Sequence, residues 1–108
     1  MIYHIVSRSD WENAGTEPYR APSLDSEGFI HCSYEHQVAA VANQFYRDQT
    51  DLVLMCIEPD RLTSRALAED PGCGELFPHV YGPINREAVV AVRALNRDGE
   101  GRWVFPQT

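Results

Sequence analysis

The chain has 108 residues, of which 44% are hydrophobic and 23% charged, a composition that fits one folded domain (1–108) and argues against disorder. The chain has nine arginines and 16 acidic residues, and the resulting net charge of -7 disfavours general nucleic-acid binding and attachment to anionic membranes. The chain has no lysine, which excludes chemistry that needs an ε-amine, such as Schiff-base formation.

The cysteines and the first residues bear on the compartment. Three cysteines at wide spacings, Cys32, Cys56 and Cys73, favour neither a disulfide framework nor a closed zinc site. The first residues lack the basic and long apolar regions of a secretion signal, and no apolar run reaches membrane-spanning length. We therefore expect a cytoplasmic protein without a membrane partner.

The first third of the chain predicts a strand, a short helix and a long connection. Residues 2–6 have the composition of a strand. Ser9 resembles a helix N-cap, and Glu12 three residues later would complete a capping box, so we expect a short helix ending at Gly15. Residues 16–28 form a long connection with two prolines, a length often found in functional loops.

The clearest helix of the sequence follows the next short strand. Residues 29–32 predict that strand, and Ser33 is a natural N-cap for a helix over 34–47. The apolar stripe expected on this helix consists of Tyr34, Val38, Val41, Ala42 and Phe45. Residues 52–57 are apolar on both faces, which predicts a central strand covered on both sides.

The last part of the chain is predicted to be mainly extended. Residues 61–68 are ambiguous, and Pro78 is expected to confine the segment 77–81 to a sheet edge or an irregular stretch. The remaining expected elements are a loop over 70–74, a second buried strand over 88–95, a turn over 97–101 and a final strand over 103–105. These elements predict an α+β fold.

Three of the four histidines fall in predicted strands: His4, His31 and His79. The fourth, His36, lies on the polar side of the helix and is interpreted as a surface residue. An imidazole on a sheet face among apolar groups is partly desolvated, so its proton affinity shifts and its hydrogen bonds become specific. One such histidine is more often a core residue than a functional one. Three in a short chain favour at least two of them meeting in one cleft.

Strand periodicity assigns the faces. His31 shares a face with Phe29, and His79 shares one with Phe77 and Tyr81. We therefore expect aromatic side chains next to the imidazoles of both His31 and His79.

Other chemistries are weaker or remain open. Adjacent strand residues point to opposite faces, so His31 cannot act as a base on Cys32, although His36 could reach that thiol from the helix. A metal site from the three strand histidines and a carboxylate is a further alternative, without a recognisable spacing. Glu75 is interpreted as solvated, whereas Glu69 could project into a cleft, where a carboxylate could stabilise a cationic transition state.

Several runs together resemble a known family: residues 19–24 (YRAPSL), 27–33 (EGFIHCS) and 77–83 (FPHVYGP), with Trp11 and the first strand. They are similar to the bacterial family called domain of unknown function 952, across nearly the whole chain. The resemblance implies a small ADP-ribosylation-like α+β fold, in which two antiparallel sheets with flanking helices form a split cleft for NAD.

By position, the resemblance places His4 in the first catalytic strand of that fold, His31 in the second, and Glu69 or His79 in the third. His4 would then bind ribose, His31 would orient the second ribose or a nucleophile, and Glu69 would stabilise an oxocarbenium-like centre. The second position is commonly Tyr or Ser in better-known branches, and the third is not clearly a glutamate on a strand. The expected binding residues are Tyr19, Phe77 and Tyr81 for stacking, Arg20 for pyrophosphate, and Ser23 beside it.

Three functions follow as hypotheses: an NAD-related ADP-ribosyl transferase or hydrolase, a non-catalytic module that binds a nucleotide or another small ligand, and a metal-dependent enzyme. NAD is a candidate substrate, and no resident cofactor or metal is firmly expected. Neither enzymatic activity nor oligomeric state follows from the sequence. If Glu69 or His79 lies within hydrogen-bond reach of a cleft formed by His4 and His31, the enzyme hypothesis gains.

Overall fold

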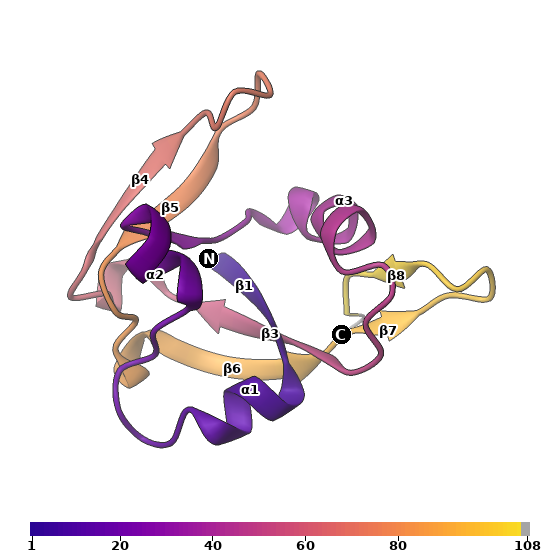
Figure 1. Ribbon diagram of the computed structural model, residues 1–108, viewed down its shortest axis with the longest axis horizontal. Coiled ribbons are helices and arrows are strands. Elements are labelled where there is room, and N and C mark those ends of the chain that lie inside the picture. Colours follow the sequence, from indigo (N-terminus) through magenta and orange to yellow (C-terminus); the bar gives the residue numbers. More distant parts are fainter. Residues whose placement is uncertain (107–108) are drawn as a thin grey trace.

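A computed structural model describes residues 1–106 of the chain. A three-stranded antiparallel sheet, in the order β1-β3-β6, lies at its centre and is formed by β1 (Ile2–Ser7), β3 (Leu52–Ile57) and β6 (Val89–Ala94) (Figure 1). All six residues of β3 are buried, because apolar clusters pack against both faces of the sheet. The prediction of a central strand covered on both sides is confirmed.

A second antiparallel sheet has the order β2-β5-β4, with β2 (Ile30–His31), β5 (Phe77–Tyr81) and β4 (Arg65–Glu69). Just after β2 the chain meets the first sheet, where Tyr3 and Ser33 exchange two backbone hydrogen bonds of 2.8 and 2.7 Å. This bridge pairs the backbones of the two sheets beside β1, and the core cluster packs Ile30 and Val80 of the second sheet against Ile2 and Met55 of the first. The predicted α+β class with two antiparallel sheets is confirmed.

The position of Pro78 corrects the sequence prediction, because β5 is the central strand of its sheet and not an edge. The Pro78 carbonyl accepts a 3.0 Å hydrogen bond from Cys32 N. The nitrogen and carbonyl of one strand residue point to the same side, so the missing N–H of proline faces the same neighbour. Position 78 therefore cannot donate the reciprocal bond to Cys32, and the paired ladder of β2 ends at His31, opposite His79.

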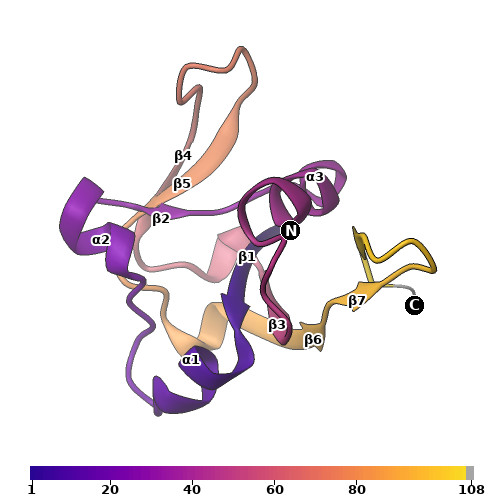
Figure 2. The same cartoon turned by 45° about the vertical axis from the view of Figure 1, so that its right-hand side comes forward.

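Two 3₁₀ helices precede the edge strands β4 and β6 along the chain: η1 (Pro59–Arg61) and η2 (Arg86–Ala88). The ambiguous segment 61–68 therefore splits, with its start in η1 and its end in β4. The β4–β5 hairpin projects away from the rest of the molecule (Figures 1 and 2).

The first helix, α1 (Arg8–Asn13), begins two residues earlier than expected. Its N-cap is Ser7, whose hydroxyl accepts a 3.1 Å bond from Asp10 N. The predicted cap at Ser9 is wrong, and with it the capping box to Glu12, because Ser9 already lies inside the helix.

The predicted connection over 16–28 contains a second helix, α2 (Pro22–Glu27). Pro22 occupies the first turn, where its lacking N–H costs no hydrogen bond. Gly28 ends the helix with φ 88°, a left-handed conformation that favours glycine. In Figure 2 this helix lies at the start of β2.

The long helix α3 (Glu35–Phe45) is capped by Tyr34 and not by the predicted Ser33, whose backbone is paired with β1. Val38 is fully buried, as the predicted stripe requires, but Phe45 is 67% exposed, so the stripe is wrong at its last member. None of the helices in residues 1–106 is long and apolar enough to cross a membrane.

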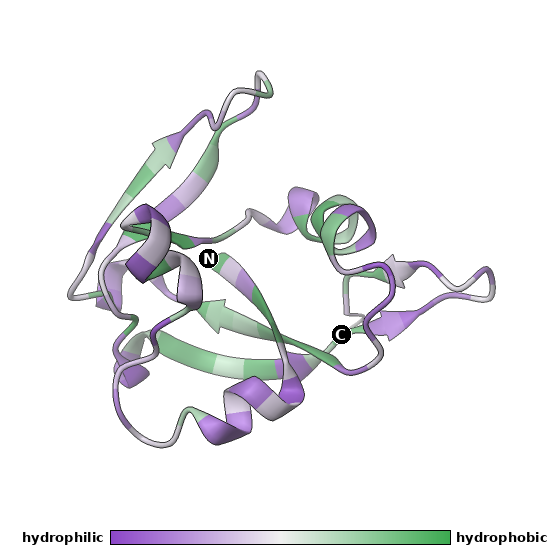
Figure 3. Ribbon diagram, in the orientation of Figure 1, coloured by the Kyte–Doolittle hydropathy of each residue, from purple (hydrophilic) through white to green (hydrophobic). Residues whose placement is uncertain are grey.

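The strand predicted over 88–95 is buried only at its ends, Ala88 and Leu95. β6 lies at the edge of the first sheet, and Val90 and Val92 are 44% and 36% exposed. Figure 3 colours much of this strand hydrophobic, although most of its residues are exposed. Hydropathy alone cannot separate a central strand from an apolar edge strand.

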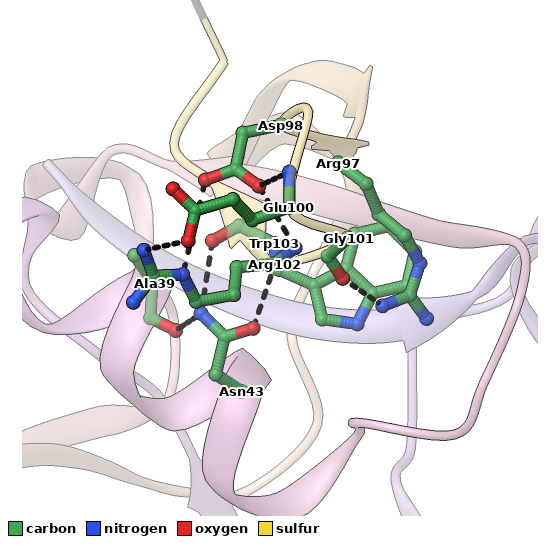
Figure 4. Close-up of polar contacts among 8 residues, drawn as sticks. All are labelled: Ala39, Asn43, Arg97, Asp98, Glu100, Gly101, Arg102 and Trp103. Carbon is green, nitrogen blue, oxygen red and sulfur yellow. Dashed lines mark hydrogen bonds and ion pairs between the residues drawn. The ribbon is translucent and has the colours of Figure 1, made fainter.

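A small hairpin of β7 (Asn96–Arg97) and β8 (Trp103–Val104) follows β6 and confirms the predicted turn between them. In the turn of this hairpin, the Asp98 carboxylate accepts hydrogen bonds from the backbone N–H groups of Glu100 and Arg102 (Figure 4). Asn43 of α3 pairs with the backbone of Trp103, donating at 2.9 Å and accepting at 2.8 Å. The Asn43 side-chain amide thus satisfies both backbone groups of Trp103, as a paired strand would, and attaches the hairpin to α3.

Candidate functional site

A pocket of about 250 Å³, the split pocket, lies where the two sheets join. One wall is formed by β1 and the start of α1, and another by residues 19–23, which lead into α2. His31 of β2 and two residues after α3 complete the pocket. Its lining residues are His4, Ile5, Val6, Ser7, Asp10, Tyr19, Ala21, Pro22, Ser23, His31, Tyr46 and Gln49. Four of the residues singled out from the sequence are among them: His4, Tyr19, Ser23 and His31.

His4 is held across the split between the sheets. Its Nδ1 lies 2.6 Å from the His31 carbonyl oxygen, and its Nε2 lies 3.3 Å from the Tyr19 hydroxyl. A carbonyl only accepts, so Nδ1 carries the proton and donates. Burial lowers the pKa of His4 to about 4, against the weaker opposite effect of the bond to His31, so the ring is neutral near pH 7.

Tyr19 completes this pair. With His4 neutral and protonated on Nδ1, the free lone pair on Nε2 accepts from the Tyr19 hydroxyl. Burial, with a smaller contribution from the Asp10 carboxylate, raises the pKa of Tyr19 to about 12, so the phenol keeps its proton. The distance of 3.3 Å is long for an O–H donor, which leaves this contact easy to replace.

His31 borders the split pocket and also an aromatic cluster on the outer face of the second sheet. Its ring lies 4.8 Å from Phe29 and 5.5 Å from His79, its cross-strand partner. Its Nε2 lies 3.0 Å from the carboxylate of Glu27 at the end of α2. The faces predicted from strand periodicity are confirmed, but the expected desolvation is not found at His31, whose side chain is half exposed.

Behind His31, the cluster contains a buried histidine and its carboxylate. Glu69 Oε1 accepts from His79 Nδ1 at 2.8 Å and from the Tyr81 hydroxyl at 2.5 Å. Both bonds lower the pKa of Glu69, and the bond from Tyr81 has the larger effect. The bond between Tyr81 and Glu69 also raises the pKa of Tyr81. Phe29 stacks on the His79 ring at 4.1 Å. Neither Glu69 nor His79 is among the lining residues of the split pocket; they reach it only through His31.

The residues expected to bind a dinucleotide are separated by the fold. Arg20 pairs with Asp25 at 2.9 Å and does not line the split pocket. Ser23 lines it and donates to the Phe29 carbonyl at 2.8 Å. Phe77 lies opposite Glu69 in the β4–β5 ladder and is also outside the lining.

Sequence reasoning missed four polar residues of the split pocket: Ser7, Asp10, Tyr46 and Gln49. Ser7 ends β1, the strand of His4 itself. Asp10 lies in α1, and Tyr46 and Gln49 follow the core-facing part of α3. No strand periodicity or motif marks them. Only the packing of α1 and α3 against β1 brings Asp10, Tyr46 and Gln49 beside His4.

The thiol and metal alternatives gain no support. Cys32 is 3% exposed in the core, on the face opposite His31 as predicted, and burial raises the pKa of its thiol. His36 lies 3.6 Å from Glu75 instead, which is not simply solvated as interpreted, since it also accepts from Gln37. Within residues 1–106, no three histidine, cysteine or acidic side chains form a group able to hold a metal ion.

With this geometry established, comparison with known proteins defines the family. The model of the family described as "Protein of unknown function (DUF952)" matches residues 5–92, and the chain belongs to this family. Because that family has no described activity, membership assigns no reaction. No curated protein matches the chain.

Solved structures agree with the fold. The chain is similar to the crystal structure of protein CC0527 from Caulobacter crescentus, at 32% identity and a TM-score of 0.81, covering 95% of this chain and 92% of that one. It is also similar to the solution NMR structure of CC0527, at 32% identity and a TM-score of 0.72, with coverages of 94% and 89%. These likenesses support the family and its α+β fold.

Proposed function

We propose that this protein binds a small, uncharged, hydroxyl-bearing ligand, of the size of a sugar or a nucleoside, in the split pocket. The observation that carries the proposal is the His4–Tyr19 pair in the pocket wall. The neutral imidazole offers one acceptor and the phenol one donor, joined by a long contact of 3.3 Å. A ligand hydroxyl, which both donates and accepts, can bond to both in place of that contact.

The charge of the split pocket favours an uncharged ligand over a phosphate-bearing one. No arginine is among the lining residues, Asp10 adds a negative charge, and His4 is neutral near pH 7. Arg20, the cation expected to meet pyrophosphate, does not line the split pocket and pairs with Asp25 at the surface. A phosphate in the split pocket would therefore lack the charge-assisted bonds that normally hold it.

The size of the split pocket points the same way. Its volume of about 250 Å³ lies just below the range of drug-sized ligand sites, which is roughly 300–1,000 Å³. A monosaccharide or a nucleoside fits this volume, whereas a whole dinucleotide would extend outside it. The further polar lining groups, Ser7, Ser23, Tyr46 and Gln49, suit a ligand with several hydroxyls.

An NAD-related transferase or hydrolase with an ADP-ribosylation-like fold, the hypothesis taken from the family resemblance, is the second candidate. The contact between the rings of His79 and His31 favours it, because it places the Glu69 carboxylate one residue behind the split pocket. It ranks second because neither Glu69 nor His79 lines the pocket that His4 and His31 share.

Thermal unfolding with four probes tests the proposal: D-ribose, adenosine, ADP-ribose and NAD. A ligand that binds only the folded state stabilises it, by about 2.7 kcal/mol at one hundred times its Kd. We expect ribose or adenosine to raise the melting temperature more than the two anionic probes do.

Two variants assign any shift to the split pocket. Tyr19→Phe keeps the ring but removes the hydroxyl, and should abolish the shift; Tyr34→Phe, outside the pocket lining, should keep it. An equal shift in Tyr19→Phe, or none with ribose and adenosine at millimolar concentration, would refute the proposal. A larger shift with NAD, together with nicotinamide release, would favour the second candidate.

A further inference from the structure

The Glu27–His31 pair has the arrangement of a carboxylate-oriented base. Glu27 Oε2 lies 3.0 Å from His31 Nε2 and therefore fixes a proton on that nitrogen when the ring is neutral. The other ring nitrogen, Nδ1, then carries the lone pair and has no hydrogen-bond partner among the described residues. His31 lines the split pocket and its side chain is half exposed, so the ring is accessible to ligand and water.

The ring of His31 is also held in place from behind. Phe29 and His79 contact it edge-on, at interplanar angles of 64° and 77°. His79 is fixed in turn by its bond to Glu69 and by stacking on Phe29. A catalytic base must be held close to its productive geometry, and this packing restricts the ring on the side away from the split pocket.

We propose that His31 is a general base that hydrolyses carboxylic esters of the hydroxyl compounds bound in the split pocket, an inference that rests on the proposed function. His31 Nδ1 takes a proton from a water molecule as the water oxygen bonds to the ester carbonyl carbon. The resulting imidazolium is stabilised by Glu27. As the bond from carbon to the alcohol oxygen breaks, Nδ1–H returns the proton to that oxygen, which releases the alcohol and the acid and restores the base.

The charges around His31 select this substrate class. Glu27 and Glu69 are both anionic, so a phosphoester would bring a negative charge against two carboxylates. A carboxylic ester is uncharged, and its alcohol is the same kind of group that the His4–Tyr19 pair is proposed to bind.

The test follows acetate release from 5-O-acetyl-D-ribose by the full chain. His31→Gln should lower the rate at least about 10²-fold, the usual minimum contribution of a general base. His36→Gln is the matched control, because His36 is also exposed and also has a carboxylate partner, Glu75, but does not line the split pocket. It should keep the rate within about twofold, and both variants should keep the wild-type melting temperature in the absence of ligand.

The contribution of the packing behind His31 is tested with His79→Ala and His79→Phe. If the buried ring holds His31 in place, kcat should fall in His79→Ala and recover in His79→Phe, which restores an aromatic ring, while KM changes little. Melting temperatures of both variants separate this effect from unfolding.

The outcomes separate the two proposals. If D-ribose stabilises the protein but acetate release is no faster than with free imidazole at the same concentration, the esterase inference is wrong and the binding proposal stands. Equal loss of rate in His31→Gln and His36→Gln would also overturn the inference, because it would show unspecific surface catalysis. If ribose does not bind but the ester is still cleaved in a His31-dependent way, the proposed function fails instead.

Discussion

The buried neutral His4 predicts a specific dependence of stability on pH. In the unfolded chain its imidazole takes up a proton near the ordinary pKa of 6.5, whereas burial in the folded chain delays protonation to about pH 4. Between these values the unfolded state binds more protons than the folded state, so stability rises with pH. The contribution of His4 is therefore complete above about pH 6.5 and is lost as the pH falls towards 4.

The size of this loss follows from the two pKa values. One pKa unit corresponds to about 1.36 kcal/mol, so the difference of about 2.5 units corresponds to a loss of about 3 kcal/mol on acidification to pH 4. Domains of this kind have about 5–15 kcal/mol in total, so the effect is readily measured. The carboxylates with lowered pKa, such as Glu69 and Asp98, lose their contributions mainly at lower pH.

The assay is urea unfolding of the wild type and His4→Asn at several pH values between 7 and 4. The asparagine amide can replace Nδ1 as donor to the His31 carbonyl but does not titrate. The variant should be less stable at pH 7, because a buried ring is lost, yet its stability should fall by about 2–3 kcal/mol less than that of the wild type between pH 7 and 4. His36→Asn, at an exposed position, should follow the wild type.

Parallel pH profiles for His4→Asn and the wild type would refute this reasoning. They would mean that the folded chain protonates His4 as readily as the unfolded chain does. The neutral state on which the His4–Tyr19 pair depends would then be absent, and the preference for uncharged ligands would lose its main support.

Three further predictions concern the fold. Gly82→Ala should lower the free energy of unfolding by about 1–3 kcal/mol in denaturant titrations, because φ is 153° there and the added Cβ would collide with Ser64; an unchanged value would contradict this strain. Gln37→Ala should cost about 1–3 kcal/mol and speed hydrogen exchange near Leu76, whose carbonyl the buried Gln37 amide binds at 2.8 Å; unchanged exchange would show that this bond does not hold the hairpin. Phe45→Ala should change stability by no more than about 0.5 kcal/mol in thermal unfolding, since the ring is 67% exposed, and a larger loss would restore it to the apolar stripe.

Strand periodicity predicted the local arrangement of the second sheet well. Alternation places His31 and Phe29 on one face and Cys32 on the other, and the structure shows this. It also places His79 and Tyr81 on one face, where both bond to Glu69. Such faces follow from the backbone of one strand, whatever the strand pairs with.

The errors arise where neighbours in space outweigh local preference. Ser33 has the chemistry of an N-cap, but its backbone is taken by pairing with Tyr3, so the cap moves to Tyr34. Pro78 is tolerated in a central strand because it faces the end of β2, where only the bond from Cys32 N to the Pro78 carbonyl is made. Residues 88–95 are apolar enough for a core strand, yet their sheet ends with them.

By itself, the sequence determined the α+β class, the central strand over 52–57, the family and the faces on which the histidines lie, because these depend on composition, periodicity and local runs of residues. Only the tertiary structure decided that His4 bonds to the His31 carbonyl, that Arg20 pairs with Asp25, and that Asp10 lines the split pocket. The Arg20–Asp25 pair is local, but it depends on α2, a helix that the sequence analysis did not predict. The other two contacts join elements from distant parts of the chain, and periodicity along one element carries no information about which other element it will meet.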